Sequence, residues 1–127
     1  MVESRFLRFC LVGTLGFVVD SGTLVVLAAD SAMGPIGGRI VSFLVAATVT
    51  WHFNRRYTFR HQVRPDARGW ARYVAVTAWG ALINLGTYAG WLAIAGDSPL
   101  QLVIGVAFGS ILALGFNYTV SRLVLFR

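Results

Sequence analysis

Long apolar segments separated by short polar turns dominate this sequence. Residues 9–29 contain one charged side chain, Asp20, and residues 73–96 and 100–121 contain none. Residues 40–53 form a shorter apolar segment, which reaches membrane-span length if the arginines beside it extend to the two interfaces. A transmembrane helix needs about 20 apolar residues, and in lipid its backbone groups must be satisfied within the segment. We therefore predict an all-α integral membrane four-helix bundle, with helices at about 6–29, 36–58, 71–96 and 100–123.

The polar positions of the first half recur in the second half. When the two halves are aligned, Asp20 falls on Asn84 and Arg55 falls on Arg122. Each half then contains two helices, so both halves insert in the same orientation as parallel repeats. Membrane proteins built from repeats often bind substrate where the repeats meet. We predict one domain over residues 1–127, made of repeats at about 5–60 and 69–127.

Arginine distribution sets the expected topology. All 11 basic residues are arginines, and six of them lie at residues 55–72, around the loop that joins the second and third predicted helices. Only Arg39 falls at the opposite ends of the helices. The positive-inside rule then places both termini and the central loop in the cytoplasm. A basic collar at a bilayer surface attracts anionic lipid heads, and it argues against a nucleic-acid partner.

Polar residues inside the apolar segments are candidates for function. Asp20 lies about midway along the first segment, where a carboxylate costs about 2.5–3.5 kcal/mol. Asn84 occupies the equivalent place in the third segment, and a hydrogen bond between the two side chains would satisfy both. The alternative is a protonated Asp20 with a purely structural hydrogen bond to a neighbouring helix.

The end of the second segment carries the densest group of polar and aromatic residues. Arg55 and Arg56 suit a lipid phosphate or pyrophosphate, because a guanidinium binds phosphate oxygens through two parallel hydrogen bonds. His52 adds a titratable donor or is an ordinary interfacial histidine. Trp51 and Tyr57 suit either an aromatic anchor at the interface or stacking against a sugar ring.

Catalytic and metal-binding patterns are absent from the sequence. The chain has no lysine for a phosphate-binding loop, and it has no HExxH, GxSxG or GxGxxG. It has one cysteine and two histidines, which are too few and too scattered for a metal site. We therefore expect a protein that is not an enzyme and that needs no metal or other cofactor.

The sequence resembles the GtrA-like family of small four-helix membrane proteins in three places. These are residues 5–9, residues 12–16 with Asp20, and residues 53–59 at the end of the second predicted helix. Asn117 with Arg122 and Phe126 looks like the counterpart of that exit in the second repeat. The resemblance covers nearly the whole chain. Thr50 and Trp51 stand where the family often has Asn-Phe, and Ser121 replaces an asparagine.

The resemblance implies translocation of a polyprenyl-phosphate-linked sugar across the bacterial cytoplasmic membrane, for synthesis of cell-surface polysaccharide. It also implies a polyprenyl-phosphate glycosyltransferase as partner. The phosphate would bind to Arg55, Arg56, Arg122, Asn54 and Asn117. The substrate path would contain Asp20, Asn84, His52, Trp51 and Tyr57.

Two other functions are compatible with a small basic bundle. The first is a non-transporting membrane anchor that recruits the glycosyltransferase through the basic loop at 60–72. The second is a small multidrug-type proton exchanger, which the arginine-rich loop and the parallel repeat disfavour. Four helices enclose little volume, so a translocating protein is expected to form a homo-oligomer or a groove open to lipid.

Overall fold

Four long helices make up the computed structural model, which describes residues 2–28, 32, 34–60 and 66–125. The described residues contain no strand, which confirms the all-α prediction. The last helix of each half continues into a five-residue π-helix. In chain order the elements are α1 (Val2–Ala28), α2 (Gly34–Phe53), η1 (Asn54–Thr58), α3 (Ala67–Ala95), α4 (Pro99–Val120) and η2 (Ser121–Leu125).

The helix α3 begins at Ala67, earlier than the hydropathy pattern predicts. Asp66 accounts for the early start, because its side chain accepts a hydrogen bond from the backbone N of Gly69 at 2.8 Å. The helix ends at Gly96, whose φ of 87° favours glycine. Ala29 at the predicted end of the first helix, Arg64 in the basic loop and residues 126–127 lie outside the described residues.

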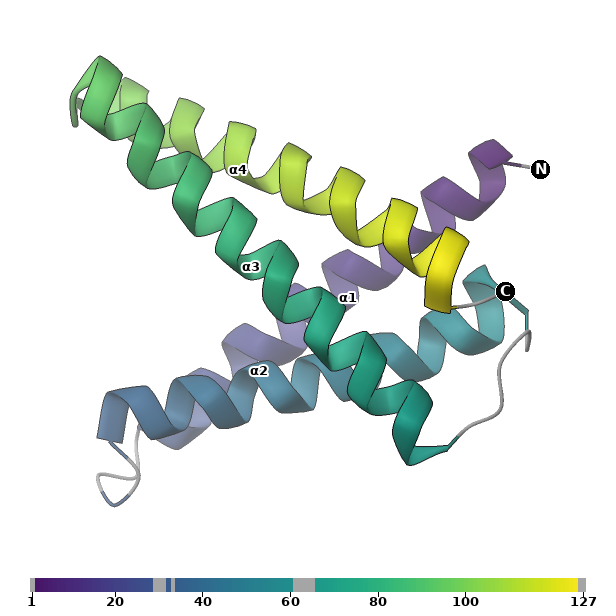
Figure 1. The fold of residues 1–127 in the computed structure, drawn as a ribbon. Helices are drawn as coiled ribbons and strands as arrows, with labels where there is room; N and C mark the ends of the chain where they lie inside the picture. Colours follow the sequence, from purple (N-terminus) through teal and green to yellow (C-terminus); the bar gives the residue numbers. More distant parts are fainter. Residues whose placement is uncertain (1, 29–31, 33, 61–65, 126–127) are drawn as a thin grey trace.

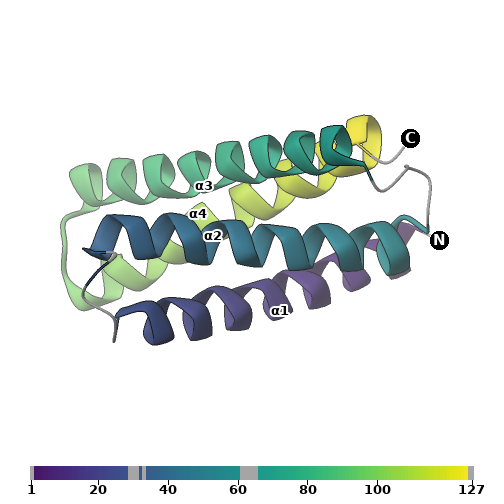
Figure 2. The ribbon, with the colours of Figure 1, turned by 90° about the horizontal axis from the view of Figure 1, so that it is seen from below.

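The helices form two antiparallel hairpins, α1 with α2 and α3 with α4 (Figure 1). Figure 2 shows the start of α1 and the end of η2 at the same end of the molecule as the start of α3. The hairpins meet at this end and diverge toward the other end (Figure 1). The same-end arrangement fits two parallel repeats, and their orientation in a membrane stays a prediction.

Close helix contact inside each hairpin depends on a glycine. A Cβ on Gly16 would overlap the side chain of Thr50, and a Cβ on Gly80 would overlap the amide of Asn117. The two contacts are equivalent in the repeat alignment, because Gly16 falls on Gly80 and Thr50 falls on Asn117. The π-helices η1 and η2 also fall on each other. The two halves thus have similar contacts at these positions, and the repeat itself stays a prediction.

Aromatic side chains form the core where the hairpins meet. Phe9 of α1 contacts Phe59 and Tyr118 with ring centroids 6.2 and 5.4 Å apart, in edge-to-face geometry. Tyr73 of α3 and Leu125 of η2 are buried in the same cluster. All four helices or their π-extensions therefore contribute to one core at the end of the bundle that carries the termini.

Large apolar side chains cover the outside of the bundle instead of filling its core. Two helical segments, Ser4–Leu27 and Val103–Leu125, are long and apolar enough to cross a membrane. Only 11% and 22% of their most apolar stretches are buried inside the protein, so they are not core helices of a soluble fold. That α2 and α3 also span the membrane stays a prediction.

Candidate functional site

Three arginines gather where α1 begins and η1 ends. Arg8 of α1, Arg56 and Tyr57 of η1, and Arg60 line a pocket of about 470 Å³, which we call the arginine pocket. Arg8 is held in place because its Nη1 donates a hydrogen bond to the backbone O of Tyr57 at 3.2 Å. The Arg56 guanidinium carbon lies 5.7 Å from the centroid of the Tyr57 ring. Arg60 has a φ of 50°, a strained conformation for a residue with a side chain, at the turn that ends η1.

The arginine pocket concentrates positive charge without a compensating carboxylate among its lining residues. Guanidinium groups bind phosphate oxygens through charge-assisted hydrogen bonds, so the pocket suits an anionic phosphate. Of the residues predicted to bind phosphate, only Arg56 lies in it. The sequence reasoning missed Arg8 and Arg60, although Arg8 lies near the start of the first predicted helix and Arg60 just after the second.

Arg55 and Arg122, also predicted to bind phosphate, lie outside the arginine pocket. The Arg55 guanidinium carbon lies 5.6 Å from the centroid of the Trp51 ring, and its Nε is buried without a hydrogen-bond partner among the described residues. The Arg55 side chain thus packs toward Trp51, whereas Arg56 lines the arginine pocket. Arg122 is exposed on η2.

A buried hydrogen-bond network connects η1 to both hairpins. Asn54 is 1% exposed, and its Nδ2 donates to the Tyr73 hydroxyl at 2.9 Å. The Thr58 hydroxyl donates to the Asn54 Oδ1 at 2.8 Å, and the Tyr73 hydroxyl donates to Thr50 at 3.1 Å. Asn54 was predicted to bind phosphate, whereas in the structure its amide holds the π-turn that carries Arg56. Such π-turns inside helices are frequent at functional sites.

A cavity of about 220 Å³ lies between the two hairpins, and we call it the central cavity. Asn117, predicted to bind phosphate, lies here and not in the arginine pocket. Its Oδ1 is buried and has no hydrogen-bond partner within the described part of the chain. The polar residues that line the cavity include Asp20, Thr50, Asn54, Tyr73, Asn117 and Ser121.

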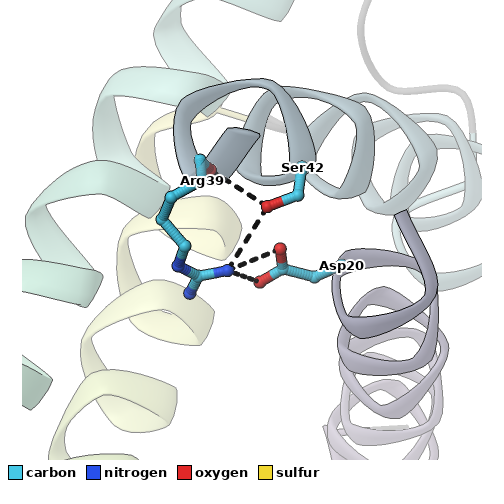
Figure 3. Close-up of polar contacts among 3 residues, drawn as sticks. All are labelled: Asp20, Arg39 and Ser42. Atoms are coloured by element: carbon cyan, nitrogen blue, oxygen red, sulfur yellow. Dashed lines mark hydrogen bonds and ion pairs between the residues drawn. The ribbon is translucent and has the colours of Figure 1, made fainter. Parts of the chain in front are cut away.

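Asp20 forms an ion pair with Arg39 across the α1–α2 hairpin (Figure 3). The Arg39 Nη1 donates to both carboxylate oxygens, at 2.6 and 2.7 Å, and lies 3.4 Å from the Ser42 hydroxyl. The predicted Asp20–Asn84 hydrogen bond is therefore wrong, because a guanidinium is a stronger partner for a carboxylate than an amide is. The Asn84 side chain instead lies against Gly109 of α4. Arg39 turns toward this carboxylate, whereas we expected it to extend to the outer interface.

The remaining residues of the predicted substrate path lie apart from the central cavity. His52 is exposed and meets the Phe53 ring edge-on, with centroids 5.7 Å apart. Tyr57 stacks on the same Phe53 ring, also with centroids 5.7 Å apart. Trp51 packs against the aromatic core. The structure thus separates these three aromatic residues from the cavity that Asp20 lines.

The described residues contain no group of three His, Cys, Asp or Glu side chains placed to hold a metal ion. The family described as GtrA/DPMS, transmembrane domain, matches residues 8–126.

Proposed function

Because this chain belongs to the GtrA/DPMS transmembrane domain family, we propose that it moves a polyprenyl-phosphate-linked sugar across the cytoplasmic membrane. Membership makes it an integral membrane protein of a family that is linked to cell-surface polysaccharide synthesis and is generally not catalytic. The substrate, the direction of movement and the bacterial inner membrane as its location are parts of the proposal.

The arginine pocket is the observation that carries this proposal. It gathers three guanidinium groups at one end of a bundle whose sides expose large apolar residues. A lipid phosphate placed there would leave its prenyl chain in contact with those apolar sides. The hydrogen bond from Arg8 to the Tyr57 backbone orders one of the three cations before a ligand arrives, which reduces the entropy cost of binding.

Polar groups continue along the bundle from this pocket. Arg8 and Asp20 both lie on α1, and a helix advances about 18 Å over the roughly 12 residues between them. That length is more than half of the roughly 30 Å thickness of the hydrocarbon core. The central cavity contacts α1 between these two residues, at Gly13 and Gly16. A polar headgroup thus has hydrogen-bonding groups to meet over much of the crossing.

Reconstitution tests the proposal directly. Proteoliposomes that contain the purified protein should move a fluorescent polyprenyl-phosphate hexose between leaflets, and Arg56→Gln should slow the movement at least tenfold. Arg122→Gln, which changes an exposed arginine outside the pocket, should leave the rate unchanged. Vesicles that show neither binding nor movement of this lipid would rule out the proposed activity.

A non-transporting anchor is the second candidate function. Arg68 and Arg72 are exposed at the start of α3, where they could bind an acidic surface of a glycosyltransferase. If the protein is an anchor, the glycosyltransferase should leave the membrane or lose activity when Arg68→Glu and Arg72→Glu are introduced together. A homo-oligomer, expected for a translocating bundle of this size, would appear in native mass spectra of the same preparation.

A further inference from the structure

The central cavity has a chemistry different from that of the arginine pocket. Its lining combines hydroxyl and amide groups with one carboxylate, Asp20, and contains no arginine. An anion would find no cation there to offset its loss of hydration. Aromatic side chains, Phe9, Phe17 and Phe43, form apolar walls beside the polar groups. Mixed walls of this kind suit an uncharged ring that carries hydroxyl groups on its edges and C–H groups on its faces.

Asn117 differs from several other polar residues of the cavity, because they are already engaged in side-chain contacts. Asp20 is paired with Arg39, and Thr50 and Asn54 bond to the Tyr73 hydroxyl. The buried Oδ1 of Asn117 has no partner in the described part of the chain. That oxygen lies against Gly80, where the close approach of α3 and α4 covers it. The amide nitrogen of Asn117, a side chain that lines the cavity, can donate a hydrogen bond to a ligand there.

Residues that line the cavity and residues that line the arginine pocket adjoin along the chain. Arg8 of the pocket and Phe9 of the cavity are neighbours in α1. Asn54 of the cavity and Arg56 of the pocket lie in the same π-turn. A ligand with an anionic group and an adjacent uncharged group could therefore contact both.

We propose that the central cavity binds the uncharged, hydroxylated headgroup of the transported lipid, and that Asn117 is a specificity-determining residue for it. This proposal rests on the proposed function, because the phosphate of the same lipid occupies the arginine pocket. The two sites then divide recognition, with the phosphate supplying affinity for any such lipid and the cavity selecting the sugar. The cavity also uses residues of both repeats, since Thr50 and Asn117 occupy equivalent positions in the repeat alignment.

Two variants test the cavity without touching the arginines. A Cβ on Gly13, which lines the cavity, would meet no atom within 4 Å, so Gly13→Val fills space without disturbing the helices. Gly22→Val is its matched control, because Gly22 has equally open surroundings on the same helix but does not line the cavity. Asn117→Leu removes the amide, and Asn84→Leu controls for it, since Asn84 also lies against a glycine but outside the cavity.

The measurement is native mass spectrometry of the full chain with a polyprenyl phosphate and with the same lipid carrying glucose, galactose, mannose or arabinose. We expect one glycosylated lipid to bind wild type more tightly than the sugar-free lipid does. Gly13→Val and Asn117→Leu should each weaken binding of that lipid about tenfold. Asn117→Leu removes a hydrogen bond to the sugar, and Gly13→Val fills the space that the sugar occupies. The two cavity variants should bind the sugar-free lipid as tightly as wild type does. Both control variants should bind the glycosylated lipid like wild type.

The outcomes separate this proposal from the proposed function. If no sugar raises affinity over the bare phosphate, or if the cavity variants weaken both lipids equally, the cavity is not a headgroup site. In that case Arg56-dependent binding of the phosphate would still support the proposed function. If wild type binds neither lipid, both proposals fail together.

Discussion

The carboxylate of Asp20 and the guanidinium of Arg39 connect the two helices of the first hairpin. A single nitrogen of Arg39 reaches both carboxylate oxygens, at 2.6 and 2.7 Å (Figure 3). Ser42 supports the pair by donating to the backbone O of Arg39 at 3.0 Å. The side chains are 58% exposed for Arg39 and 20% for Asp20, so the pair lies at an edge of the bundle. Asp20 also lines the central cavity, so the ion pair borders the proposed headgroup site.

Breaking the Asp20–Arg39 pair should destabilise the protein, and the two single changes should not be additive. Asp20→Asn and Arg39→Gln should each lower the melting temperature in detergent, because each leaves one charge without its partner. The double variant should recover most of the loss, with a coupling energy of about 1 kcal/mol. Additive losses in a thermal unfolding series would show that the two side chains contribute independently.

Loss of one arginine from the arginine pocket should weaken binding of a polyprenyl phosphate. Arg8→Ala, Arg56→Ala and Arg60→Ala each remove a charge-assisted hydrogen bond, worth about 1.5–3 kcal/mol, or roughly tenfold to a hundredfold in Kd. Arg122→Ala should bind normally in the same equilibrium titration. An equal loss for Arg122→Ala would return that arginine to the phosphate site, as the sequence predicts. Binding should also weaken as salt rises, because the lining residues are charged.

Two glycine-to-alanine substitutions in α3 should have opposite effects on the stability of the protein. A Cβ on Gly80 would overlap the Asn117 amide, whereas a Cβ on Gly86 would meet no atom within 4 Å. Gly80→Ala should therefore cost about 1–3 kcal/mol through overpacking. Gly86→Ala should be neutral or stabilising by up to about 1 kcal/mol, because alanine favours the helix. Unfolding in denaturant measures both, and a stable Gly80→Ala would contradict the close contact between α3 and α4.

Removing the Tyr73 hydroxyl should destabilise η1 more than removing an exposed hydroxyl does. Tyr73→Phe leaves the buried Asn54 Nδ2 without its acceptor, which costs about 1–3 kcal/mol. Tyr57→Phe is the control, because Tyr57 is 50% exposed and keeps its ring contact with Phe53. Melting temperatures in detergent compare the two. Phosphate binding of Tyr73→Phe should fall as well, since η1 positions Arg56, and an unchanged Kd would separate the network from the pocket.

The amino-acid sequence alone predicted the all-α class and the approximate place of every helix. Hydropathy and capping are local properties, so a run of apolar residues and the glycine that follows it predict a helix and its end without knowledge of the fold. The arginines also indicated one end of the bundle as the candidate site, which stays a prediction. The alignment of the two halves pairs Gly16 with Gly80, and the structure gives each of them a close contact with the next helix.

Only the tertiary structure decided which polar groups meet. Asp20 has Arg39 of the adjacent helix as its partner and not the asparagine of the other repeat, because hairpin packing brings Arg39 to it first. Arg8 of the first helix joins Arg56 beyond the second, whereas the neighbouring Arg55 turns away toward Trp51. Asn117 lines the central cavity while Arg122 is exposed on η2. These pairings depend on how each helix is rotated about its axis and how it crosses its neighbours. Hydropathy along the chain does not determine that rotation.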